Sequence, residues 1–120
     1  MFDWLKNQLK RIRQPKHWIV NVDEAAIHAT DYTGVSASIL KSELSTVVIE
    51  TNDTGPLASD VWWMLYDSSN QLGSAFPHDA DGAQMAIDYL MTHEGFNHAE
   101  MITAMGSTAN AKFLVLERPA

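Results

Sequence analysis

Hydrophobic residues in this chain of 120 residues recur first with a helical period and then with a strand period. In the opening segment the apolar residues are spaced by three, four and three positions, which places them on one face of a helix. That face consists of Phe2, Leu5, Leu9 and Ile12, and the adjoining flank carries Lys6, Lys10 and Arg13. Pro15 ends the segment, because the residue before a proline is pushed out of the α region. Residues 1–16 are therefore predicted to form an amphipathic basic helix.

From Trp18 onward, apolar and polar residues alternate as they do in β-strands. Alternating runs end at Val22, begin again at Ile27, and resume after the turn sequence Asp31–Gly34, which predicts a hairpin. A β-branched, apolar run predicts a more fully buried strand over residues 44–51. Further strands are predicted over residues 61–66, 72–76 and 113–116, and turn formers break the chain at residues 52–56.

Two helices are predicted between the last two strands. Asp79 or Asp81 is the expected N-cap of the first helix, and Gly95 lies just beyond its end. Asn97 opens the second helix with an N-x-x-E sequence close to a capping box, and Gly106 closes it. The inner face of the first helix is expected to carry Met85, Ala86, Tyr89 and Leu90.

The order of these elements predicts an α+β fold. Hairpin-length connections favour one antiparallel β-meander of about five to six strands, with the N-terminal helix before it and two C-terminal helices packed on one face. A strongly bent sheet closed by a C-terminal helix, as in pleckstrin-homology-like domains, would suit this order, an analogy of fold that carries no function. The expected division is a basic helix over residues 1–16 and a single α+β domain over residues 17–120.

Composition and charge narrow the partners. The chain has no cysteine, which excludes disulfides and thiolate chemistry. No secretory signal is visible, and the longest apolar run, residues 61–66, is too short to cross a bilayer, so a cytoplasmic location is expected. Residues 1–17 carry five basic residues and one acidic residue (+4), and residues 18–120 carry three basic and fourteen acidic residues (−11). An acidic domain disfavours nucleic acid and favours a basic partner surface or the chain's own basic helix.

Two short motifs resemble metal sites but lack the required spacing. His93 and His98 are five positions apart with Gly95 between them, whereas a zinc helix needs histidines four apart. The segment that begins at Asp79 resembles the start of a calcium loop, but Ala83 and Leu90 stand at two ligand positions. We therefore expect no metal ion and no cofactor, and no residue is identified as catalytic.

The Trp62–Trp63 pair is the strongest candidate for a binding surface. Adjacent strand residues face opposite sides of a sheet, so one indole is expected in the core and the other on the opposite face. An outward Trp near Asp53 and Asp60 would be a binding anchor, because Trp is enriched at interface hot spots. The competing expectation is that the N-terminal or a C-terminal helix covers it.

Two segments of the chain resemble a group of small bacterial proteins. The first segment contains Thr51, Asp53 and Gly55-Pro56 followed by Asp60-Val61 and Trp63. The second contains Gly95-Phe96 and continues through Ala104-Met105 to Ser107-Thr108. The resemblance spans residues 18–118 and implies a bacterial origin. The group has no established activity, so no site residue follows from it.

Three classes of function stay open. The first is a non-enzymatic module that binds a protein partner, one form being an acidic, immunity-type antagonist of a basic nuclease. The second is a protein of the membrane surface, held by Phe2, Leu5 and Leu9 with Lys6, Lys10 and Arg13 on anionic lipid. The third is an enzyme whose site the sequence does not reveal. The same helix residues are expected to dock on the domain, on a second copy in a homodimer, or on a membrane, because so short a helix is marginal alone.

Overall fold

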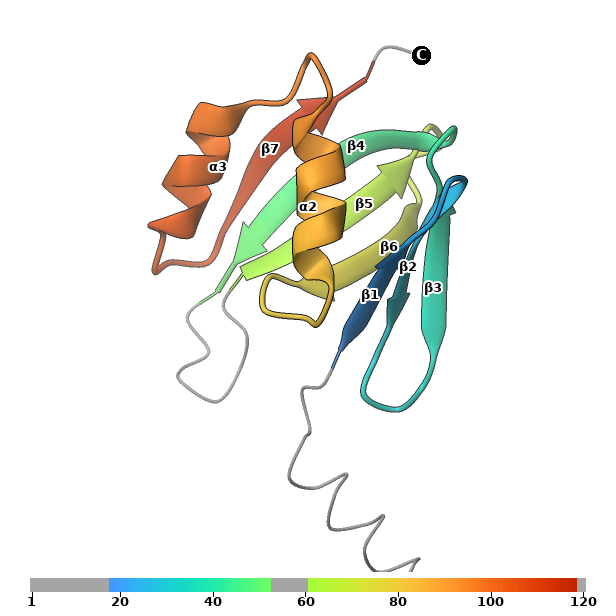
Figure 1. The fold of residues 1–120 in the computed structure, drawn as a ribbon. Helices are drawn as coiled ribbons and strands as arrows, with labels where there is room; N and C mark the ends of the chain where they lie inside the picture. The colour runs from blue at the N-terminus through green and yellow to red at the C-terminus, as the bar shows by residue number, and fades with distance from the viewer. Residues whose placement is uncertain (1–17, 53–60, 119–120) are drawn as a thin grey trace, which may run out of the picture.

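The structure is a computed structural model that describes residues 18–52 and 61–118 (Figure 1). The N-terminal helix predicted over residues 1–16 lies outside these residues. The strands that the structure describes are β1 (Ile19–Val22), β2 (Ala26–Thr30), β3 (Ser36–Leu40), β4 (Leu44–Thr51), β5 (Val61–Asp67), β6 (Leu72–Pro77) and β7 (Ala111–Glu117). Two helices, α2 (Ala83–Met91) and α3 (His98–Met105), separate β6 from β7. Each strand and helix predicted within the described residues is present at its predicted position.

The predicted fold class is nevertheless wrong. The described residues form a mainly β protein whose strands divide into two antiparallel sheets, β1-β2-β3 and β6-β5-β4-β7, with only two short helices. The single meander, and with it the likeness to pleckstrin-homology-like domains, fails because β4 leaves the first sheet. It pairs with β5 on one edge and with β7, the last strand of the chain, on the other. Alternation specifies which side chains face the core, but it does not specify which strand lies alongside.

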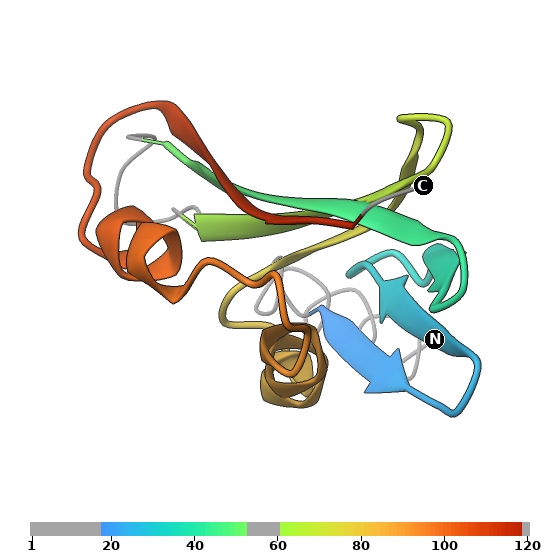
Figure 2. The same ribbon diagram turned by 90° about the horizontal axis from the view of Figure 1, so that it is seen from above.

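The core lies on one face of the four-stranded sheet, here called the inner face. Figure 2 shows α2, α3 and the three-stranded sheet all on this side of the four-stranded sheet. Trp63 is fully buried here, and its ring stacks on those of Phe76, His78 and Phe96 with centroids 6.3–6.5 Å apart. Its indole Nε1 donates a hydrogen bond of 3.1 Å to Nδ1 of His78. The other inner-face side chains of the sheet that are completely buried include Val47, Ile49 and Leu65.

The two sheets are joined where β3 lies beside β6. The buried Ser74 hydroxyl of β6 donates a 3.0 Å hydrogen bond to the carbonyl oxygen of Ala37 in β3. Gly73 packs directly against Ile39, and a Cβ at residue 73 would lie 2.9 Å from the Ile39 side chain. This close approach requires a glycine, and it explains how two separate sheets share one core.

The free edge of β7 is partly occupied. A bulge interrupts the pairing of β4 with β7 at Val47 and Val48, and it turns both Val115 and Leu116 into buried positions. The backbone N–H of Asn97, just before α3, donates a 2.7 Å hydrogen bond to the carbonyl oxygen of Val115. The connection between the helices therefore closes part of the sheet edge.

The two helices begin differently from each other. Asn97 caps α3 as predicted, since its side chain accepts a 3.0 Å hydrogen bond from the Glu100 N–H. The predicted cap of α2 is wrong. Gly82 occupies that position with a φ of 81°, and no side chain caps the helix. Met85 was also expected on the inner face of α2, but its side chain is 65% exposed.

Gly82 sits against the strand that enters the fold. The backbone N–H of Val20 in β1 donates a 2.7 Å hydrogen bond to the carbonyl oxygen of Asp81, and the Asp81 N–H donates one of 2.9 Å to Trp18. A Cβ on Gly82 would collide with the carbonyl oxygen of Val20. Both the positive φ and the contact with β1 therefore exclude a side chain at this position.

Gly34 provides a matched control for a test of this contact, because it has a φ of 92° but no atom within 4 Å of its Cβ position. We expect Gly34→Ala to lower the free energy of unfolding by about 1–2 kcal/mol from left-handed strain alone. Gly82→Ala should lower it by about 2–5 kcal/mol, since overpacking adds about 1–3 kcal/mol. Urea denaturation of both variants measures the difference, and equal losses would contradict a close approach at Gly82.

Candidate functional site

The opposite side of the four-stranded sheet, here called the outer face, carries apolar side chains that no described element covers. Cross-strand pairing aligns one row over all four strands, with Val48 of β4 opposite Met64 of β5 and Leu114 of β7. Ala75 of β6 completes the row beside Met64. Leu114 is 46% exposed, and the other three residues are half-buried. A sheet face in contact with water is ordinarily polar, so a wholly apolar row is typical of a surface that binds something.

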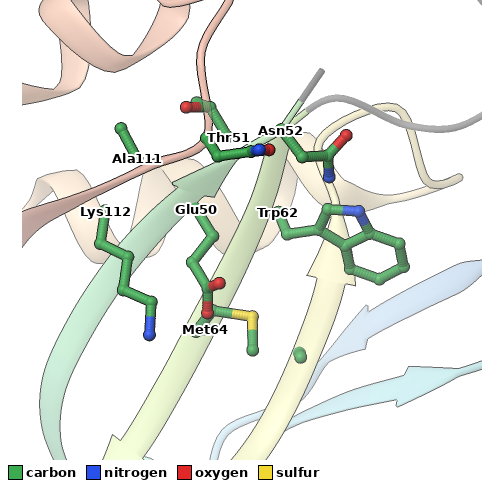
Figure 3. Close-up of a pocket in the computed structure, with 9 residues that line it drawn as sticks. Glu50, Thr51, Asn52, Trp62, Met64, Ala111 and Lys112 are labelled. Atoms are coloured by element: carbon green, nitrogen blue, oxygen red, sulfur yellow. The ribbon is translucent and has the colours of Figure 1, made fainter. Parts of the chain in front are cut away.

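A hollow of about 480 Å³ lies at one end of this face, beside the row (Figure 3). Its apolar lining residues are Trp62, Met64, Ala75 and Ala111. Its polar residues are Glu50, Thr51, Asn52, Asn110 and Lys112, which come from β4, β7 and the segments next to them. A mostly apolar lining with a few polar groups is the usual composition of a binding pocket.

Trp62 lines this hollow because its neighbour Trp63 is buried. The two residues are consecutive in β5, so the strand alternation that sends Trp63 into the core places Trp62 on the outer face. The indole of Trp62 meets that of Trp18 edge to face, with ring centroids 5.3 Å apart and the planes at 84°. The chain therefore enters the described fold at the rim of the outer face.

Opposite charges lie side by side at the hollow. Glu50 of β4 pairs with Trp62 on one side and with Lys112 of β7 on the other. The side chains of Glu50 and Lys112 extend in the same direction along the sheet (Figure 3). Such a pair next to an indole and a thioether suits a partner that presents an apolar group with charged groups beside it. It provides hydrogen bonds and orientation rather than a nucleophile with its base.

The structure separates the residues that the sequence grouped as a binding site. Trp62 is the indole that faces outward and it lines the hollow, whereas Trp63 is 0% exposed and has no surface to offer a partner. Asp53 and Asp60 lie outside the described residues. So do the helix residues expected to dock on a partner or membrane, which are Phe2, Leu5, Lys6, Leu9, Lys10 and Arg13. The C-terminal helices do not cover Trp62, because α2 and α3 pack on the other side of the sheet (Figure 2).

Several residues of the outer face were missed by sequence reasoning. Glu50, Leu114 and Lys112 gather there through the pairing of β4 with β7, whose residues lie about sixty positions apart in the chain, and Met64 joins them from β5. A signal was present in the uninterrupted apolar run of residues 61–66, because a strand that is apolar on both faces is expected to be covered on both faces.

A second constellation lies on the three-stranded sheet. Ser38 Oγ of β3 is hydrogen bonded to Nδ1 of His28 at 2.6 Å, and Nε2 of His28 lies 2.7 Å from Asp23 Oδ2. The contacts run from serine through histidine to carboxylate as in a nucleophilic triad, but the two ring nitrogens are exchanged, since a triad histidine faces the serine with Nε2 and the carboxylate with Nδ1. The hollow lies on the other sheet, and Ser38 is an exposed residue within a paired strand.

Asp23 also has a structural role. Its Oδ1 accepts hydrogen bonds from the N–H groups of Ala25 and Ala26, at 2.9 and 2.7 Å, in the turn between β1 and β2. The hydrogen bond with His28 and these two backbone bonds lower the pKa of the Asp23 carboxyl to about 2. The carboxylate is thus fixed in its ionised form at the turn.

The histidines that sequence reasoning weighed as metal ligands have aromatic and backbone partners. His93 lies 3.1 Å from the Leu90 carbonyl oxygen through Nδ1 and packs edge to face on Tyr89. His98 packs edge to face on Phe96. Within residues 18–52 and 61–118, no three side chains of the histidine and acidic types gather closely enough to hold a metal ion.

The Asp23 carboxylate predicts a pH dependence of stability. Its pKa of about 2 in the folded protein lies below the value of about 3.9 expected in the unfolded chain. The stabilisation is therefore complete above about pH 5 and is lost as the pH falls towards 2. Asp23→Asn should lower the melting temperature at pH 7 and flatten its decline between pH 5 and 2. Glu24→Gln, which removes the same charge from the same turn, should leave the decline unchanged, and identical profiles for both variants would contradict this role.

Comparisons with known proteins found no relative of this chain. No protein-family model matches the chain. No curated protein and no solved structure matches it. Among the described residues, no helix is long and apolar enough to span a membrane. The resemblance to a group of small bacterial proteins therefore stays a prediction that rests on two short segments.

Proposed function

We propose that the chain is a non-enzymatic binding module that recognises a protein partner through the outer face of its four-stranded sheet. The observation that carries this proposal is the apolar row of Ala75, Met64, Val48 and Leu114 beside the Trp62 hollow, on a face that no described element covers. Trp is enriched at the centres of protein interfaces, and charged residues lie mostly at the rim. Trp62, with Glu50 next to it and Lys112 one strand further along the sheet, follows that arrangement.

The charge of the domain favours a basic partner. The described residues carry twelve acidic and three basic side chains, a balance of −9. Such a field attracts a cationic surface and repels an anionic one, which speeds association and selects against acidic partners. The partner we propose therefore presents an amphipathic segment, apolar in its centre and basic at its flank. An antagonist of a basic protein would meet this description.

Hydrolysis is the second candidate function, and the hydrogen-bonded order Ser38–His28–Asp23 favours it. Two features argue against it. Asp23 already accepts two backbone hydrogen bonds of the turn, and Ser38 lies in the middle of a strand that is paired with β2. Acyl transfer also requires donors aimed at the developing oxyanion, and the hollow that would hold a substrate lies on the other sheet.

A charge substitution on the apolar row tests the binding function. Leu114→Lys should weaken the complex with the partner at least tenfold in Kd, because it replaces an apolar contact with a cation that repels a basic surface. Met85→Lys on α2 makes the same change at a residue that is 65% exposed on another surface, and it should bind like the unchanged chain. Proteins retained from a cell extract by the chain and lost with Leu114→Lys would be produced in pure form for calorimetry. Equal affinity for both variants would exclude the outer face as the binding surface.

Labelling of Ser38 separates the two candidate functions. A fluorophosphonate reacts with an activated serine hydroxyl, so a binding module should take up no label at Ser38 over hours at pH 8. The same assay on Ser38→Ala and His28→Ala gives the background. Stoichiometric labelling that both substitutions abolish would establish a nucleophilic serine and overturn the non-enzymatic proposal.

A further inference from the structure

We propose that residues 1–14 of the same chain dock as an amphipathic helix on the outer face of the four-stranded sheet. This inference rests on the proposed function, because it assigns to the same face an occupant from within the chain that a partner must displace. Four features of the sequence and the described residues support it: the composition of the strands, the point of chain entry, the length of the segment, and the distribution of charge.

The strands of the four-stranded sheet have the composition of strands covered on both faces. Residues 61–66 are uninterruptedly apolar in β5, residues 47–49 in β4, and residues 113–116 in β7. Strands that are buried on both faces have such continuous runs, whereas a face in water interrupts them with polar residues. The inner face is covered by α2, α3 and the first sheet (Figure 2). The outer face needs a cover of its own.

The chain enters the fold beside this face. Trp18 is the first described residue, and its indole packs against Trp62 at the hollow. The hydrogen bonds between Trp18, Val20 and Asp81 hold this entry point in place. A segment that immediately precedes Trp18 is therefore tethered at the rim of the outer face, which gives it a high effective concentration there.

The length of the segment fits the sheet. A helix over residues 2–13 is about 18 Å long at 1.5 Å per residue. Across four strands spaced by about 4.8 Å, the face of a sheet is about 15 Å wide. Along a strand, five residues at about 3.3 Å each extend over a similar distance. The apolar positions Phe2, Leu5, Leu9 and Ile12 extend over the same distance as the row from Ala75 to Leu114. In the docked arrangement, Pro15 and the two residues after it would supply the turn between the helix and Trp18.

The charges are complementary. The segment up to residue 17 carries +4, and the remainder of the chain carries −11. Glu50 and Glu117 belong to the outer face by register, and the exposed Asp79 and Asp81 lie beside the entry of β1. In the docked helix, Lys6, Lys10 and Arg13 would lie near these acidic residues, and the apolar face of the helix would cover the apolar row of the sheet.

Because the chain contains no cysteine, site-specific cross-linking provides a clean test. Gln8→Cys lies next to the apolar face of the predicted helix and leaves that face intact. It is combined with Lys112→Cys on the outer face or, as the control, with Met85→Cys on α2. Met85 is exposed and only three residues from Gly82, which contacts the entry strand, so a tethered but undocked segment should reach it at least as easily. A short bismaleimide is added to the full chain, and the linked peptides are identified by mass spectrometry.

The expected result is an intramolecular link from residue 8 to residue 112 that forms at least ten times faster than the link to residue 85. Leu5→Asp with Leu9→Asp should abolish this preference, and added salt should reduce it. Equal rates for the two pairs would overturn the inference. A link found mainly in covalent dimers would overturn it in favour of a second copy, and loss of the link on anionic vesicles with co-sedimentation of the chain would favour a membrane.

The two proposals fail separately. If the cross-link forms but Leu114→Lys leaves partner affinity unchanged, the helix covers the face and the partner binds elsewhere. If no preferential link forms but Leu114→Lys weakens partner binding tenfold, the proposed binding function is supported and the docking of residues 1–14 on the outer face is excluded.

Discussion

The burial of Trp63 is the constraint on which the rest of the molecule depends. Its ring stacks on those of Phe76, Phe96 and His78, and its indole N–H is hydrogen bonded to His78. A side chain of this size contributes more to the core than most, and with its donor satisfied it leaves no cost of an unpaired polar group. The same burial fixes the register of β5. Because a slip of one residue would exchange the two faces of the strand, Trp62, Met64 and Tyr66 are held on the outer face for as long as Trp63 stays in the core.

A second dependence runs from Gly82 to the candidate site. The left-handed backbone at Gly82 allows α2 to begin against the carbonyl oxygen of Val20, and the neighbouring Asp81 holds β1 through two backbone hydrogen bonds. These contacts set the position at which Trp18 meets Trp62. The helix on the inner face thus determines where the chain arrives at the outer face, although no residue of α2 itself lies there.

Local chemistry made part of this structure predictable. The period of the apolar residues located the strands and helices, Asn97 was recognisable as a cap, and the Trp62–Trp63 pair revealed that one indole must face outward. The division into two sheets was not predictable. The pairing of β4 with β7 joins residues about sixty positions apart, and the two sheets meet through contacts such as that of Ser74 with Ala37. The acidic residues near Gly82 favoured the wrong cap because backbone contact with β1, rather than a side-chain oxygen, sets the start of α2. Glu50 and Lys112 became neighbours only through that same long-range pairing.

The hydrogen bond from Asn97 to Val115 has a consequence for how this protein associates. An exposed strand edge offers unpaired N–H and C=O groups to any other chain, and this is the common route to open-ended β-aggregates. On β7 one of these carbonyl groups is already occupied, and the adjacent bulge distorts the line of those that remain. Growth of the sheet by a further strand is therefore disfavoured on this side. At this end of the sheet, encounters with another chain are left to the outer face, where they end with one bound partner rather than propagating.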